Sequence, residues 1–186
     1  MPQHEIQFFA SDNELARHVA SAWLRAVASA PRTNTPQTIA LSGGRIARKL
    51  FVSIAEQATA QKISLAHLHF FWADERCVPP SDPESNFAIA SELLLRPLGI
   101  VDDHIHRIRG ELDPDTAAAE AARDLLATAP RNADGTPVLD WIFLGMGEDG
   151  HVASLFPGEK ISAIESPSVY RAVVASKPPP HRITLG

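Results

Sequence analysis

The chain has 186 residues, of which 45% are hydrophobic and 21% charged, and its formal net charge is −5. This length fits a single domain over residues 1–186, and the acidic balance argues against a nucleic-acid-binding protein. The only cysteine, Cys77, excludes an intrachain disulfide and a thiolate metal cluster. Because we find neither a secretory signal nor an apolar run of about 20 residues, we expect a cytoplasmic protein without a membrane partner.

Helices and short apolar strands alternate along the chain. A capping box at Ser11 to Glu14 opens the first helix, and the pair Asp113-Pro114 opens a later helix that runs to Ala127. Two more helices are predicted from periodicity, at residues 46–60 and 86–95. Short apolar segments predict strands at residues 38–41, 67–72, 139–144, 169–174 and 182–185.

This alternation predicts an α/β fold, a three-layer α/β/α sandwich with a mostly parallel, Rossmann-like sheet. In such a fold, ligands bind beyond the carboxyl ends of the strands. Three loops qualify by position, and all of them carry glycines or charged residues: 42–45, 73–76 and 145–151. We therefore expect the functional site where these loops meet.

The last of these loops has the strongest chemical signature. An apolar run ends at Leu144, and a segment with three glycines then leads to His151. Glycines such as Gly147 and Gly150 let a ligand approach the backbone, and an imidazole can change protonation near neutral pH. The pattern predicts that His151 is a general base, whose tautomer either Asp149 or Asp74 could fix. A tight turn that carries an incidental histidine is the alternative.

The turn Ser42-Gly43-Gly44 stands between a predicted strand and a predicted helix. The first turn of a helix has unpaired N–H groups and a partial positive charge, so it can hold a phosphate. Ser42 and Arg45 could add hydrogen bonds to such an anion. The spacing is not that of a P-loop, and a plain tight turn remains the alternative.

Three charged residues, Asp74-Glu75-Arg76, directly follow an aromatic strand. Arg76 offers a planar fork that suits phosphate or carboxylate, and Asp74 could orient an imidazole or a substrate hydroxyl. An exposed cluster of ion pairs is the alternative. Asn86 is interpreted first as the start of a helix capped by Ser85, and a substrate contact there is secondary.

The remaining candidates favour structural roles. The pairs His67/His69 and His104/His106 have no carboxylate or cysteine at ligand spacing, so we expect core or surface histidines and no metal site. Ser154 lacks the Gly-x-Ser-x-Gly setting of a hydrolase nucleophile, and we expect it in a helical or capping position.

Taken together, the motifs resemble the 6-phosphogluconolactonase family, in the superfamily of sugar-phosphate isomerases and glucosamine-6-phosphate deaminases. The matching blocks run in family order: 41–44, 72–76, 78–79, 85–86, 144–158 and 180–185. The resemblance implies hydrolysis of 6-phospho-D-glucono-1,5-lactone in the oxidative pentose phosphate pathway, by a monomer or homodimer without a metal or organic cofactor. It also implies that Arg182 shares phosphate and hydroxyl recognition with Arg76 and the turn at 42–44.

The deaminases of the superfamily differ at two informative places. They have tyrosine where this chain has Arg76, and Phe-Asn-Glu-Pro-Gly where this chain has residues 154–158. The chain also departs from the family pattern, because Arg45-Ile46 replaces a small hydroxyl residue and proline, and Gly186 replaces threonine. Members continue beyond this point, so we expect that C-terminal elements are missing. A sugar-phosphate-binding homologue without turnover is the alternative function.

Overall fold

The computed structural model describes residues 4–31, 35–158 and 168–186. Its elements follow one another along the chain as α1 (Asp12–Ser29), β1 (Gln37–Leu41), α2 (Arg45–Gln61), β2 (Leu68–Trp72), β3 (Asp74–Arg76), α3 (Asn86–Ala90), the π-helix η1 (Ser91–Leu95), the 3₁₀-helix η2 (Asp102–His104), α4 (Pro114–Thr128), β4 (Trp141–Ile142), β5 (Tyr170–Val174) and β6 (His181–Leu185).

Two helices begin at the capping signals in the sequence. Ser11 Oγ accepts a hydrogen bond from the Glu14 N–H at 3.2 Å, and Glu14 Oε2 accepts one from the Ala10 N–H at 3.1 Å. Asp113 Oδ1 accepts the N–H of Thr116 at 3.1 Å at the start of α4. These side chains satisfy N–H groups that have no partner within the helix, so the predicted starts of α1 and α4 are confirmed.

Within the described ranges, the strands form two sheets of three strands each. The first has the order β2-β1-β4 and is parallel, as the alternation of strands and helices predicts. The second has the order β3-β6-β5 and is antiparallel. The α/β class is thus confirmed, but the expectation of a mostly parallel sheet holds for the first sheet only. Residues 74–76, expected in a loop, form β3 because they pair with β6.

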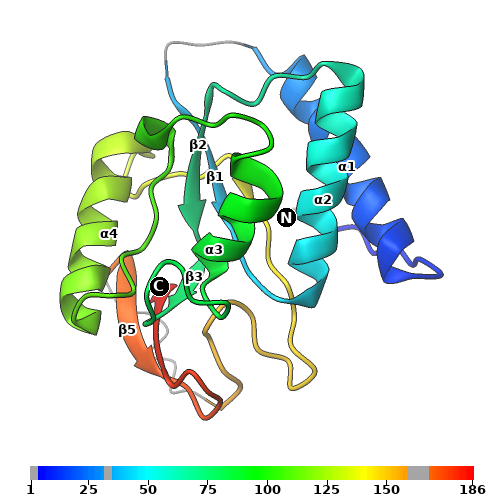
Figure 1. Cartoon of the computed structure of the whole chain (residues 1–186). Helices are drawn as coiled ribbons and strands as arrows, with labels where there is room; N and C mark the ends of the chain where they lie inside the picture. The colour runs from blue at the N-terminus through cyan, green and yellow to red at the C-terminus, as the bar shows by residue number, and fades with distance from the viewer. Residues whose placement is uncertain (1–3, 32–34, 159–167) are drawn as a thin grey trace.

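Helices lie on both sides of the central strands (Figure 1). In that view α1 and α2 lie together on one side of β1 and β2, whereas α4 lies on the opposite side next to β5. The core between them is apolar and includes fully buried aromatic side chains of α2 and β2, namely Phe51, Phe70 and Trp72. This core holds the ends of β1 and β2 in place, and the site lies beyond these ends.

The third strand of the parallel sheet is shorter than predicted. Residues 139–144 were expected to be extended, but only Trp141–Ile142 pairs with β1 as a strand. Asp140 supports the start of this pairing, because its Oδ2 accepts the Thr38 N–H at 2.7 Å. Across the described ranges, no helix combines the length and the apolar character needed to cross a bilayer.

Candidate active site

A cavity of about 520 Å³ lies where the three predicted loops meet. Its volume is within the range of small-molecule sites, roughly 300–1,000 Å³. The wall includes all of the predicted site residues except Asp149 and Gly150: Ser42, Gly43, Gly44, Arg45, Asp74, Arg76, Asn86, Gly147, His151 and Arg182. Segments that are far apart in the sequence therefore supply one concave surface with several polar groups.

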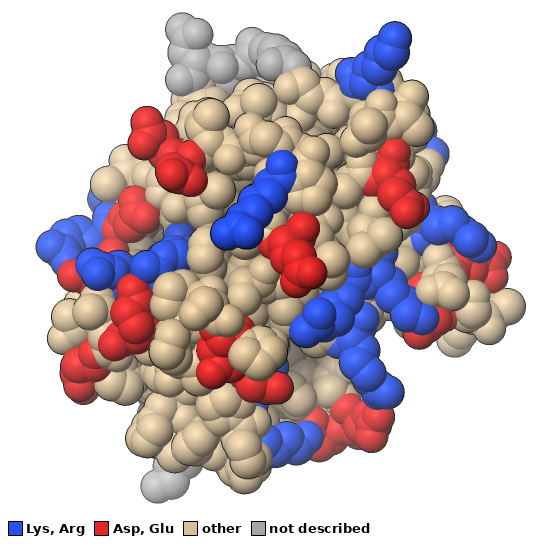
Figure 2. Space-filling model, in the orientation of Figure 1, with Lys and Arg blue, Asp and Glu red and all other residues tan. Residues whose placement is uncertain are grey.

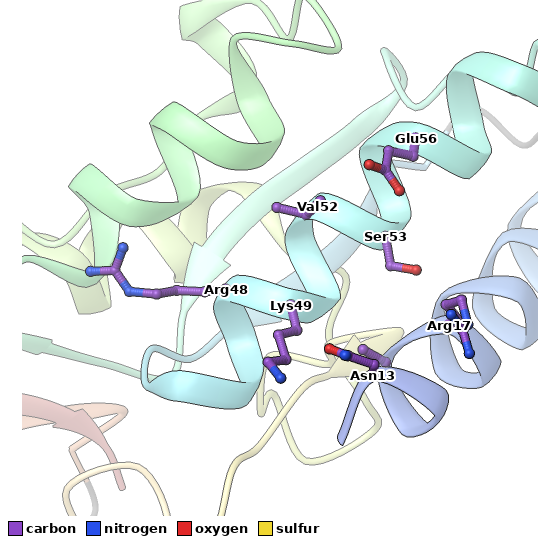
Figure 3. Close-up of a pocket in the computed structure, with 8 residues that line it drawn as sticks. Asn13, Arg17, Arg48, Lys49, Val52, Ser53 and Glu56 are labelled. Atoms are coloured by element: carbon purple, nitrogen blue, oxygen red, sulfur yellow. The ribbon is translucent and has the colours of Figure 1, made fainter. Parts of the chain in front are cut away.

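A second hollow, of about 330 Å³, lies between α1 and α2 (Figure 3). Three basic side chains line it, but Lys49 is paired with Asp12 at 2.7 Å and Arg48 points away from Arg17 and Lys49 in the figure. The described residues of its wall include no histidine. The acid–base group of this hollow is the carboxylate of Glu56, whereas the cavity at the strand ends contains the imidazole of His151 beside two arginines.

His151 is held by a carboxylate and an aromatic ring. Its Nδ1 lies 2.5 Å from Asp149 Oδ1, and its ring stacks on Phe156 with a centroid distance of 5.0 Å. Because an ionised carboxylate can only accept a hydrogen bond, the neutral ring that contacts it carries its proton on Nδ1. Nε2 then keeps its lone pair. Of the two carboxylates considered from the sequence, Asp149 is the one that contacts the imidazole. The imidazole at the cavity wall can therefore accept a proton at Nε2.

Lys177 extends this chain of contacts. Its Nζ lies 2.8 Å from Asp149 Oδ2, on the other oxygen from the one that contacts His151. Hydrogen bonds from Lys177 and His151 lower the pKa of Asp149, so this carboxylate is ionised near neutral pH. Lys177 was not predicted from the sequence, because no motif links it to a loop nearly thirty residues earlier.

Gly147 and Gly150 are needed for different structural reasons in residues 145–158, the histidine loop. A Cβ at Gly147 would lie 2.1 Å from the ring atoms Cε1 and Nδ1 of His151, so only glycine lets the ring sit there. Gly150 has φ = +82°, a conformation that favours glycine. Gly150 and Asp149 do not appear among the described residues that line the cavity. Their positions indicate that they shape the loop and orient His151.

Asp74 lies on the buried floor of the cavity. Its Oδ2 accepts the hydroxyl of Ser154 at 2.8 Å, and its Oδ1 accepts Nδ2 of Asn86 at 3.3 Å. Burial raises the pKa of Asp74, and the Ser154 hydrogen bond opposes this shift. The expectation of a helical or capping Ser154 is wrong, because its fully buried hydroxyl bonds to β3 instead. This contact anchors the histidine loop on the second sheet.

Two arginines from neighbouring strands face the cavity. Arg76 and Arg182 are register partners in the antiparallel pair of β3 and β6. Arg182 is only 4% exposed, and its guanidinium donates to the carbonyls of Pro179 at 3.0 Å and Lys177 at 3.5 Å. Burial and the nearby Arg76 lower the pKa of Arg182. No ion pair to Arg182 is found within the described ranges, so this end of the cavity can accept an anion.

The glycine turn completes the wall at the start of α2. Gly44 precedes the helix with φ = +97°, and Gly43 lies against Asn86 so closely that a Cβ would be 1.8 Å from Asn86 Oδ1. Arg45 is at the rim, where its exposed side chain pairs with Glu148 at 2.8 Å. An exposed pair of this kind adds little stability, so Arg45 can release Glu148 for a ligand at small cost. Figure 2 shows Lys and Arg side chains gathered around this part of the surface.

The histidines that sequence analysis assigned to structural roles lie away from the cavity. His69 Nδ1 is 2.9 Å from His106 Nε2, and His106 Nδ1 is 3.0 Å from Asp124 Oδ2. His104 packs against His69 with a centroid distance of 4.2 Å. Within the part of the chain that the structure describes, no group of three or more His, Cys, Asp or Glu residues could hold a metal ion.

Comparisons with known proteins place this chain in a family. The profile of glucosamine-6-phosphate isomerases/6-phosphogluconolactonase matches residues 10–186. A 6-phosphogluconolactonase of Haemophilus influenzae is 46% identical over 124 residues, which cover 67% of this chain and 51% of that protein. One from Treponema pallidum is 42% identical over 146 residues, covering 78% of this chain and 60% of that protein. The chain thus matches about half to three fifths of the length of these relatives.

A solved structure supports the same assignment. The 6-phosphogluconolactonase of Trypanosoma brucei superposes with a TM-score of 0.85 at 26% identity, over 99% of this chain and 76% of that one. A monomeric glucosamine-6-phosphate deaminase, at 15% identity and a TM-score of 0.77, shares the fold. The chain belongs to the family of glucosamine-6-phosphate isomerases and 6-phosphogluconolactonases.

Proposed function

We propose that this protein hydrolyses 6-phospho-D-glucono-1,5-lactone to 6-phosphogluconate, the reaction that the resemblance implies. The observation that carries the proposal is the placement of His151, oriented by Asp149, in the same cavity as Arg76 and Arg182. One part of the cavity offers a base and another accepts an anion. The names of the curated relatives support this substrate class.

In the proposed reaction, Nε2 of His151 takes a proton from a water molecule as the water oxygen attacks the lactone carbonyl carbon. The bond between this carbon and the ring oxygen then breaks, and the ring oxygen takes up the proton that His151 carries. A positioned general base contributes about 10²- to 10⁴-fold to the rate. Asp149 stabilises the imidazolium that forms between the two proton transfers, and Lys177 keeps that carboxylate ionised.

The basic end of the cavity recognises the substrate in this proposal. Arg76, Arg182 and the turn at 42–44 share the contacts to the phosphate and the sugar hydroxyls. The negative charge that develops on the carbonyl oxygen needs a donor, and an arginine or a backbone N–H of the glycine loops can supply it. Asp74 is too well bonded to Ser154 and Asn86 to move freely, so it serves as a fixed acceptor for a substrate hydroxyl.

The test compares turnover with binding. We expect the purified chain to hydrolyse the lactone well above its spontaneous rate in the same buffer, and to bind 6-phosphogluconate. Arg182→Gln should weaken product binding by about 10-fold or more, because a charge-assisted contact is lost. Binding of 6-phosphogluconate without any acceleration of hydrolysis would instead identify a sugar-phosphate-binding protein. Absence of both would contradict the proposal.

A further inference from the structure

Glu75 is a buried carboxylate that the proposed mechanism does not use. It is the middle residue of β3, and it is only 2% exposed. No ion pair to Glu75 is found in residues 4–31, 35–158 and 168–186, and it does not line the cavity. Burying a carboxylate without a cation is costly unless hydrogen bonds compensate. Hydrogen bonds from neighbouring groups must therefore compensate for the burial of Glu75.

Four donors surround this carboxylate. Oε1 accepts the N–H groups of Arg76 and Asn86 at 2.7 and 2.8 Å. Oε2 accepts the Phe87 N–H at 2.8 Å and the Ser85 hydroxyl at 3.0 Å. Asn86 and Phe87 open α3, so two of these N–H groups would otherwise lack a partner in the helix. Glu75 thus fastens the beginning of α3 to β3.

The residue held most directly by this contact is Asn86. Its side chain is 1% exposed, and its Nδ2 donates to the carbonyl and to Oδ1 of Asp74 at 2.9 and 3.3 Å. These two acceptors determine which side of the amide faces Asp74, and Oδ1 consequently faces Gly43. Asn86 therefore supports two parts of the cavity wall at once, the Asp74 carboxylate and the glycine turn before α2.

We infer that Glu75 is a positioning residue for substrate binding, which acts through Asn86 and does not touch the substrate. This inference rests on the proposed function. When Asn86 shifts, Asp74 and the turn at 42–44 lose their common support, and the contacts to the bound sugar phosphate weaken. His151 is held separately, by Asp149 and by stacking on the Phe156 ring. Loss of Glu75 should therefore affect affinity more than the chemical step.

The test of this inference compares Glu75→Gln with the control variant Glu92→Gln. Gln keeps one oxygen that can accept hydrogen bonds. Its NH₂ group replaces the other oxygen and cannot accept hydrogen bonds from the donors there. Glu92 is an exposed glutamate in η1, so its variant matches the change in charge. We expect Glu75→Gln to raise KM about 10-fold while kcat stays within about 3-fold, since a contact made equally in the ground and transition states changes KM alone.

A double-mutant cycle shows whether the effect passes through Asn86. In the background of Asn86→Ala, Glu75→Gln should change kcat/KM by less than about 2-fold, because coupled residues are not additive. If the two substitutions multiply their effects, or if Glu75→Gln keeps the wild-type KM and only melts at a lower temperature, the inference is wrong. Ser85→Ala, which removes one of the four donors, should raise KM in the same direction by a smaller factor.

One measurement does not depend on activity. Hydrogen exchange at the N–H groups of Asn86 and Phe87 should be faster in Glu75→Gln than in Glu92→Gln or the wild type. If the wild type does not hydrolyse the lactone, the proposed function fails, and the dissociation constant of 6-phosphogluconate then replaces KM in the cycle. Unchanged exchange at these two groups, with unchanged affinity, would overturn the positioning role whatever the activity.

Discussion

Buried polar contacts between residues far apart in the sequence support the wall of the cavity. Ser154 and Asp74 are 80 positions apart, yet their side chains meet in the interior. The hydroxyl donates to a carboxylate that has little access to water, and the same contact ties the histidine loop to β3. Such a buried bond costs more to break than a surface bond, because the carboxylate is left without its donor.

Ser154→Ala should therefore destabilise the protein and impair turnover. We expect a loss of about 1–3 kcal/mol in the free energy of unfolding, the usual cost of leaving a buried polar group unsatisfied. The pKa of Asp74 should rise further, since the hydrogen bond that opposes the burial effect is gone. Urea unfolding and kcat measure the two effects, and the exposed Ser81→Ala is the control. Equal stability of both variants would contradict this role.

Gly43 provides a second test of how closely the cavity wall is packed. A Cβ at this position would lie 1.8 Å from Oδ1 and 2.5 Å from Cγ of Asn86, whose side chain is held by Asp74. Gly43→Ala should therefore weaken 6-phosphogluconate binding and lower the melting temperature. If the clash is the cause, Asn86→Ala in the same chain should restore the melting temperature in part. A Gly43→Ala variant with wild-type affinity and stability would contradict the close packing.

The starts of two helices could be predicted from the sequence, whereas the pairing of the second sheet could not. The starts of α1 and α4 were predictable because Ser11 and Asp113 bond to N–H groups within the next three residues. β3 was missed because its three charged residues match a loop locally, and its strand pairing depends on β6 more than a hundred residues later. The antiparallel second sheet was missed for the same reason, since strand direction depends on distant partners.

The histidines around β2 make stability depend on pH. His69 lies against His104 and His106, and Asp124 bonds to His106. Burial and the two neighbouring imidazoles lower the pKa of His69 to about 4. The unfolded chain, with a pKa of about 6.5, binds a proton at this residue before the folded chain does. The contribution of His69 to stability is therefore present above that value and is lost as the pH falls toward 4.

His69→Gln should reduce this dependence on pH. Gln can still form a hydrogen bond, but it takes up no proton. Urea unfolding at about pH 7 and about pH 5 should show a smaller loss of stability in the variant than in the wild type, because one proton-linked group is removed. A matched substitution at the exposed His18 should leave the loss unchanged. An equal loss in His69→Gln and wild type would contradict this assignment.

At the scale of the whole molecule, the location of the site was predictable and part of its support was not. The rule for parallel sheets indicated that the loops after β1, β2 and β4 meet, and the cavity lies there. This rule does not predict the positions of Lys177 and Glu75. Lys177 lies in the loop before β6, and Glu75 lies in β3 of the antiparallel sheet. Only a tertiary fold brings Lys177 to Asp149.

An apolar surface lies beside the cavity. Ile142, Leu144 and Met146 are 47%, 53% and 77% exposed, at and after the edge strand β4. A hollow of about 440 Å³ adjoins them, lined largely by apolar side chains of α1 and α2. Apolar side chains on an unprotected edge strand favour pairing with another chain, and natural edges often carry lysine instead.

We therefore expect this chain to self-associate as its concentration rises. Ile142→Lys should reduce the association measured by sedimentation velocity, since it places a charge on the edge. Val101→Lys is the matched control, because Val101 is 53% exposed elsewhere on the surface. Both variants should retain the wild-type affinity for 6-phosphogluconate. A wild-type chain that stays monomeric at every concentration, or an equal effect of both substitutions, would contradict the expectation.

The proposed mechanism requires that His151 activates water in a cavity where arginines hold the substrate. The most direct test is the ratio of kcat between the wild type and His151→Asn, with the dissociation constant of 6-phosphogluconate measured alongside. We expect kcat to fall by about 10²- to 10⁴-fold, the contribution of a positioned base, while the dissociation constant changes by less than about 3-fold. A His151→Asn variant that retains the wild-type kcat would contradict the account.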